Sequence, residues 1–124
     1  DEDEIILSAE HDGYRYLKDK PVHKRTIQLF TKRLVIKDEI NSNDLNAIIR
    51  FHLHPTINLI MNSDGLSGRL ETKLGDHYEW SAIADYISIE KHKFAPNFGI
   101  LIPTQTICLY QEVNRAPSFM LNWF

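Results

Sequence analysis

The chain has 124 residues, of which 43% are hydrophobic and 25% charged, and its formal net charge is −3. This length fits one domain over residues 1–124 with a single hydrophobic core. Lysine and arginine are spread along the chain, which argues against a nucleic-acid-binding face, and no apolar run approaches the roughly 20 residues of a membrane span, so we expect neither partner.

Hydrophobic and polar side chains alternate with a period of two along most of the chain, as in strands of antiparallel sheets with one buried face. After an apolar start at residues 5–7, strands are expected at 22–30, 33–38, 47–54, 66–74, 104–113 and 118–124. In the segment 47–54, the pattern places Ile49, Phe51 and Leu53 on the buried face. Arg50 and His52 then point to the opposite face.

One further segment follows the same alternation, and another has an ambiguous pattern. In residues 66–74, Leu70, Thr72 and Leu74 share one face. Residues 83–92 are the best helix candidate, but Tyr86 and Ile89 favour a strand there as well.

Short polar connections separate these strands. Turns or loops are expected at residues 30–33, 41–46, 62–65 and 74–76. Residues 95–97 and 115–117 each contain a proline, which has no amide hydrogen to donate, so we expect them to interrupt pairing. Strands recurring about every 8 to 12 residues predict an all-β fold, an antiparallel β-sandwich.

The two ends and the single cysteine add two expectations. An acidic run at residues 1–4 leads directly into Ile5, and the chain closes on Trp123 and Phe124. Because exposed strand edges invite aggregation, these ends suggest a fragment of a larger sandwich.

The chain has one cysteine, Cys108, which excludes an internal disulfide and a cysteine-rich zinc site. The place of Cys108 in an alternating strand indicates an inert thiol.

Four ordered segments carry a resemblance to a known family. They read HDGYR at residues 11–15, VHKR at 22–25, LVIKDE at 34–39 and RFHLHP at 50–55. Their order and spacing resemble the C-terminal part of bacterial heparinase II/III-like proteins, which are polysaccharide lyases. The resemblance is good over about residues 9–55, weaker around 79–88 and thin from residue 94 onward.

The resemblance implies an α-helical toroid followed by a large antiparallel β-sandwich, and cleavage of uronic-acid polysaccharides by β-elimination. The implied partners are an anionic polysaccharide and the helical toroid of the same parent chain. In family members, the catalytic tyrosine and histidine belong mainly to the toroid, with one histidine from the early sandwich. These motifs lie upstream of the matched segments, so no catalytic residue is carried over to this chain.

His52 and His54 stand two residues apart on an expected strand, so both imidazoles project from one face. They could supply two ligands of a structural zinc, with a third from His11, Asp12 or His23. Two other interpretations remain open: contact with substrate or toroid, and, as the favoured one, a polar strand face hydrogen-bonded within the sandwich. Apart from this structural zinc, no cofactor is expected.

The first matched segment could line the cleft between sandwich and toroid through His11, Tyr14 and Arg15, since arginine suits carboxylate recognition. The competing interpretation is a turn in which Asp12 bonds backbone amides and Gly13 supplies a positive φ.

The second matched segment places His23 and Arg25 where they could meet an anionic sugar chain. A solvated strand face is the simpler interpretation of the same two residues.

Five aromatic residues raise a second class of function, a carbohydrate-binding module that stacks sugars. They are Tyr78, Trp80, Tyr86, Phe119 and Trp123. Most aromatic residues in strands belong to the core, however, because each buries about 150 to 250 Å².

Taken together, the sequence predicts the C-terminal β-sandwich segment of a heparinase II/III-like lyase. Its expected role is to support the toroid and line one wall of the substrate cleft, without being catalytic alone. The alternative is a free-standing carbohydrate-binding or structural β-sandwich module.

Overall fold

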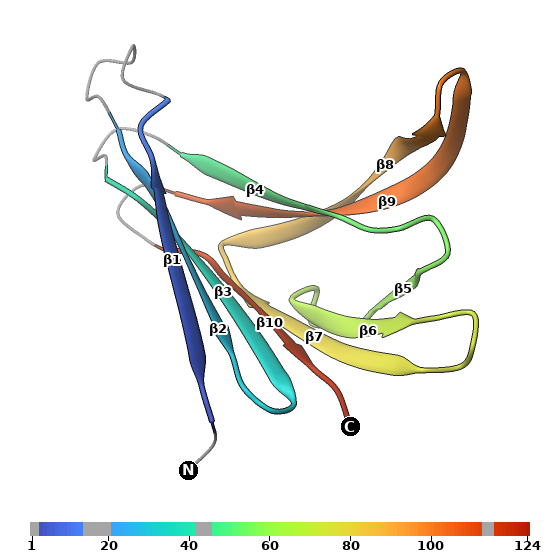
Figure 1. Ribbon diagram of the computed structural model, residues 1–124, viewed down its shortest axis with the longest axis horizontal. Helices are drawn as coiled ribbons and strands as arrows, with labels where there is room; N and C mark the ends of the chain where they lie inside the picture. Colours follow the sequence, from blue (N-terminus) through green and yellow to red (C-terminus); the bar gives the residue numbers. More distant parts are fainter. Residues whose placement is uncertain (1–2, 14–20, 42–45, 113–115) are drawn as a thin grey trace.

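The computed structural model describes residues 3–13, 21–41, 46–112 and 116–124, and its strands form two antiparallel sheets (Figure 1). The strands are β1 Ile5–His11, β2 His23–Leu29, β3 Arg33–Ile40, β4 Ala47–His52, β5 Asn58–Met61, β6 Ser67–Glu71, β7 His77–Ile83, β8 Tyr86–Asn97, β9 Ile100–Gln111 and β10 Ser118–Asn122. Across these described ranges, no helix is long and apolar enough to cross a membrane.

The larger sheet has seven strands in the order β1-β2-β3-β10-β7-β6-β5, and the smaller has three in the order β4-β9-β8. The smaller sheet crosses one face of the larger, and the long β8–β9 hairpin reaches away from it (Figure 1). This arrangement confirms the expected all-β antiparallel sandwich.

The hydrophobic core lies between the sheets. Its fully buried members are Ile49, Leu70, Trp80, Ile107, Leu109 and Phe119. A stack of rings joins the two layers: Phe51 of β4 lies 4.6 Å from Phe119 of β10, centroid to centroid, and Phe119 lies 6.1 Å from Trp80 of β7. The core therefore holds the smaller sheet in a fixed position over the larger.

The predicted facing of residues 47–54 is confirmed. Ile49 is 6% exposed, and Phe51 and Leu53 are half-buried against the core, whereas Arg50 and His52 are exposed. The period of two thus identified the inner face of β4 correctly.

The interruption of pairing expected at residues 95–97 is confirmed, since the ladder runs to Phe94 opposite Ile102 and resumes at Asn97 opposite Ile100. Strand β8 continues through Pro96 to Asn97, with a bulge between Phe94 and Asn97. Because β8 is an edge strand, a proline there costs no central ladder bond. Pro103 lies in β9, opposite Lys93 of β8. The pairing of β4 with β9 ends at Thr106, so β9 has a strand partner on one side only at Pro103. The absence of an amide hydrogen on Pro103 is therefore tolerated as well.

Two boundaries differ from expectation. Strand β6 ends at Glu71, and a turn closed by the amide of Thr72 donating to the carbonyl of Asp76 replaces the last residues of the expected strand. Leu74 therefore lies in the turn and is 91% exposed instead of facing inward. Strand β5 was not expected at all, since its four residues, Asn58–Met61, show too short a pattern.

Gly68 of β6 is needed for close packing. A Cβ atom at this position would lie 1.9 Å from the carbonyl oxygen of Ile60 and 2.8 Å from Nε1 of Trp80. Any larger residue would push the β5–β6 pair and the Trp80 indole apart.

Candidate functional site

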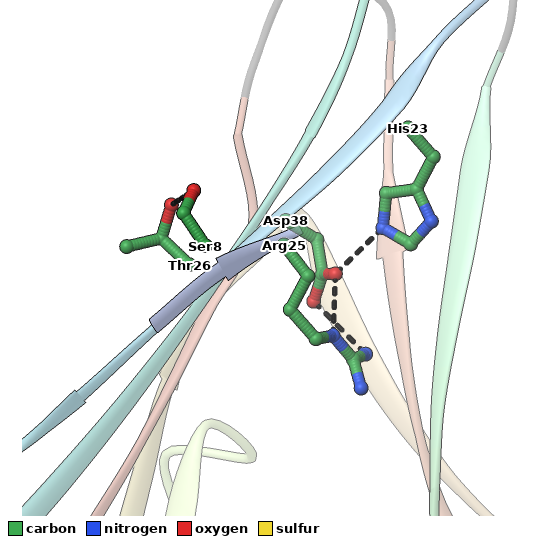
Figure 2. A network of polar contacts seen from close by, with 5 residues as sticks. All are labelled: Ser8, His23, Arg25, Thr26 and Asp38. Carbon is green, nitrogen blue, oxygen red and sulfur yellow. Dashed lines mark hydrogen bonds and ion pairs between the residues drawn. The ribbon is translucent and has the colours of Figure 1, made fainter. Parts of the chain in front are cut away.

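Two of the candidate residues, His23 and Arg25, converge on the carboxylate of Asp38 (Figure 2). Nε2 of His23 lies 2.7 Å from Oδ1 of Asp38. Arg25 donates from Nε to Oδ1 at 2.8 Å and from Nη2 to Oδ2 at 3.2 Å. A carboxylate only accepts hydrogen bonds, so Nε2 of His23 carries the hydrogen.

Strand register explains how these side chains meet. Arg25 of β2 stands directly opposite Asp38 of β3, and His23 stands opposite Ile40. Alternation along β2 then sends His23 and Arg25 to the same face as Asp38. Thr26 points the other way, toward Ser8 of β1, as Figure 2 shows.

This cluster faces the smaller sheet. Asp38 is 2% exposed, while the side chains of His23 and Arg25 are 24% and 37% exposed. The guanidinium carbon of Arg25 lies 5.5 Å from the ring centroid of Phe51 in β4, within range of a cation–π contact. His23 and Arg25 therefore keep part of their contact with solvent, as a solvated strand face would, but Arg25 also packs against Phe51 of the smaller sheet.

The geometry gives Asp38 a clear structural role. A buried carboxylate is tolerated when it is paired and hydrogen-bonded, and here two basic side chains satisfy it. Contact of His23 and Arg25 with a polysaccharide stays a prediction.

His11 ends β1 and stands opposite His23 of β2. The amide of Gly13 donates to Nδ1 of His11 at 3.4 Å. Gly13 is not among the glycines with positive φ, so that expectation was wrong; a Cβ there would instead lie 2.3 Å from the His11 ring. Tyr14 and Arg15 lie outside the described residues.

His52 and His54 bind separate partners. Nδ1 of His52 lies 2.8 Å from the hydroxyl of Thr106, and Nδ1 of His54 lies 2.8 Å from the hydroxyl of Thr56. Strand β4 ends at His52, so His54 lies past the strand. Within the part of the chain that the structure describes, no three His, Cys, Asp or Glu side chains are grouped to hold a metal ion.

A polar network that the sequence did not reveal covers the outer face of the smaller sheet. Tyr110 donates to Oε1 of Glu90 at 3.0 Å, and Ser88 donates to the Tyr110 hydroxyl at 3.2 Å. Nε2 of His92 lies 3.3 Å from Oε2 of Glu90, and the His92 ring meets that of His52 at a centroid distance of 5.4 Å.

This network changes the acidity of two groups. The hydrogen bond from Tyr110, with a second from His92, lowers the pKa of Glu90. Burial, followed by the nearby charge of Glu90, raises the pKa of the Cys108 thiol. Cys108 is fully buried, as an inert strand residue would be.

The five aromatic candidates for sugar stacking separate by exposure. Trp80 and Phe119 are core residues at 1% and 6% exposure, and Tyr78 and Trp123 are half-buried. Tyr86 is 58% exposed.

The architecture is thus an antiparallel β-sandwich with an ion-paired cluster between its sheets, and a known protein family matches this chain. The model of the heparinase II/III-like, C-terminal family matches residues 1–121. The chain therefore belongs to this family. The match extends well beyond residues 9–55, where the motifs were clearest.

Solved structures share the fold. The heparan sulfate lyase HepC from Pedobacter heparinus has a TM-score of 0.81 and 9% identity, covering 96% of this chain and 20% of that one. A solved heparinase III has a TM-score of 0.75 and 10% identity, covering 95% of this chain and 19% of that one. The chain thus spans about a fifth of the length of either structure. No curated protein sequence matches it.

Proposed function

We propose that this chain is the C-terminal β-sandwich of a polysaccharide lyase that cleaves uronic-acid polysaccharides by β-elimination. The observation that carries this proposal is the family match over residues 1–121. The likeness of the fold to a domain about one-fifth the length of a heparan sulfate lyase supports it.

In this proposal the chain supports a helical toroid and lines one wall of the substrate cleft. His11 and His23 stand opposite each other at one end of the β1–β2 pair, next to the segment that holds Tyr14 and Arg15. The two imidazoles at this end of the sheet suit hydrogen bonding to the hydroxyls and carboxylates of an acidic sugar chain.

The chain is not expected to be catalytic alone. β-Elimination requires a base for the C5 proton, an acid for the leaving oxygen and a group that neutralises the sugar carboxylate. Of the candidates that the structure describes, Arg25 already forms a two-point bond with Asp38, and His23 donates to the same carboxylate. These contacts favour a supporting and substrate-contacting role over proton transfer.

The cleft-lining role is tested by steady-state kinetics of the longer lyase that carries this chain. His11→Ala and Arg15→Gln should raise KM for a uronate polymer about three- to tenfold, because each removes a substrate hydrogen bond. Lys32→Gln, at the opposite end of the β2–β3 hairpin, is the matched control and should leave KM unchanged. Equal KM values in all three variants would rule out the cleft-lining role.

A further inference from the structure

The outer face of the three-stranded sheet is built in cross-strand rows. Register places Ile48, Tyr110 and Tyr86 in one row, and Arg50, Cys108 and Ser88 in the next. Because Ile49, Ile107 and Ile87 face the core, these two rows face away from the larger sheet.

The first row contains a rigid aromatic platform. The rings of Tyr86 and Tyr110 are stacked with centroids 4.4 Å apart and planes 7° apart. The Tyr110 hydroxyl is fixed between Glu90 and Ser88. Tyr86, at 58% exposure, therefore rests on a ring that cannot readily turn, and little conformational freedom remains to be lost on binding a ligand.

A pocket of about 460 Å³ adjoins this platform, at the end of the smaller sheet opposite the β8–β9 hairpin tip. Its lining combines both tyrosines and Ile48 with the polar residues Asp85, Gln111 and Glu112. The carboxylate of Asp85 accepts from the amide of Glu112 at 2.6 Å and from Nε2 of Gln111 at 3.4 Å, which fixes the polar wall. The volume falls within the range of small-molecule sites, about 300 to 1,000 Å³.

The chemistry of this pocket suits an uncharged sugar. A sugar ring has an apolar face that packs on tyrosine and hydroxyls that donate to carboxylates and amide oxygens. The two carboxylates of Asp85 and Glu112 would repel a sugar that carries its own carboxylate.

Arg50 supplies the opposite charge beside the pocket. It lies two residues from Ile48 on the same face of β4, about 6.6 Å along the strand at 3.3 Å per residue. Within the described part of the chain, Arg50 takes part in no hydrogen bond or ion pair and acts on Glu90 only through its charge. Its guanidinium is therefore available to a carboxylate on the neighbouring sugar.

We propose that this surface binds an acidic disaccharide unit, with the uncharged sugar in the pocket against Tyr86 and the carboxylate of the adjoining uronate on Arg50. The site lies on the outer face of the smaller sheet, whereas His11 and His23 lie at the end of the β1–β2 pair in the larger sheet. It rests on the proposed function only for the choice of a uronate-containing glycan.

The test is a titration of the 124-residue chain, followed by NMR, with a hexosamine–uronate tetrasaccharide and with its carboxyl-reduced analogue. Tyr86→Ala should weaken binding of both ligands about fivefold, since stacking on a ring contributes about 1 kcal/mol. Arg50→Gln should weaken binding of the acidic ligand by a similar factor and leave the reduced analogue unaffected. Tyr86→Phe, which keeps the ring, should bind as the parent chain does.

Two control variants carry the same changes elsewhere. Phe98→Ala removes a fully exposed ring at the hairpin tip, and Arg69→Gln removes an exposed arginine from the larger sheet. Neither should change the affinity. The proposal fails if no saturable binding occurs at millimolar ligand, if Tyr86→Ala has no effect, or if Arg69→Gln weakens binding as much as Arg50→Gln.

These outcomes are distinct from those of the lyase proposal. A longer protein that cleaves uronates while this chain binds no tetrasaccharide would remove the disaccharide site and leave the lyase function intact. If this chain binds the tetrasaccharide but the longer protein cleaves no uronate, the disaccharide site is supported and the lyase function is ruled out.

Discussion

Arg25 and Asp38 are joined by two hydrogen bonds, at 2.8 and 3.2 Å, although Asp38 is almost completely buried. The same guanidinium lies over the ring of Phe51, which stacks on Phe119 of the opposite sheet. One arginine thus compensates a buried charge in β3 and contacts the aromatic stack that joins the layers. This relationship explains why a basic side chain points between two sheets.

Asp38→Asn should destabilise the chain by about 2 kcal/mol. Breaking a fully buried ion pair costs about 3 to 5 kcal/mol, and the loss is smaller here because Arg25 and His23 are partly exposed and keep some hydration. The free energy of unfolding in urea gives the value. Glu39→Gln is the control, since its pairing with Lys37 is exposed and should contribute about 0 to 1 kcal/mol. An equal loss in both variants would show that the buried cluster adds nothing.

Phe51→Ala should lower the free energy of unfolding by about 3 kcal/mol. It removes the ring that stacks on Phe119 and leaves a cavity between the sheets. The matched change Phe98→Ala, at a fully exposed position, should stay within about 0.5 kcal/mol of the parent chain. If thermal unfolding gave both variants the same midpoint, the place of Phe51 in the core would be wrong.

His52 and His54 should not form a tight zinc site. Structural zinc takes four ligands at about 2.0 to 2.3 Å, and these imidazoles instead bind Thr106 and Thr56. Metal analysis of protein purified without chelators should find zinc well below one ion per chain. Stoichiometric zinc that disappears on His52→Ala would establish the site.

Tyr110→Phe should raise the pKa of Glu90 toward its usual value of 4.5, because the phenol is the main group that lowers it. A carboxyl group with a lowered pKa in the folded state stabilises the fold above its unfolded pKa. That stabilisation is lost as the pH falls through the folded value. An NMR titration of the Glu90 carboxyl below pH 4.5 measures the shift, and identical titration curves in the parent and the variant would contradict the assignment.

The Arg25–Asp38 pair could have been predicted from the sequence. Residues 30–33 form the turn of a hairpin in which Leu29 pairs with Leu34. Moving one residue at a time away from the turn along both strands places Arg25 opposite Asp38. The alternation that identified the strands also assigns both side chains to one face. What the pattern could not supply was the direction of that face, because this depends on where β4 crosses.

The Glu90–Tyr110 contact could not have been predicted in the same way. The two residues lie on the 12-residue strands of the β8–β9 hairpin, and the bulge between Phe94 and Asn97 shifts their register by one residue. Since a one-residue slip sends every side chain to the opposite face, counting from the turn would have misplaced both of them.

The central claim, a lyase sandwich that is inactive alone, is tested most directly by the ultraviolet absorbance of the unsaturated product. The 124-residue chain and the longer protein that carries it are assayed in parallel, at equal molar concentration, on heparan, alginate and other uronate polymers. We expect turnover by the longer protein and none by the chain, since misplacing a catalytic group by about 1 Å can cost 10²-fold in rate. Turnover by the chain that His11→Ala or Tyr14→Phe abolishes, or no turnover by the longer protein on any uronate, would contradict the claim.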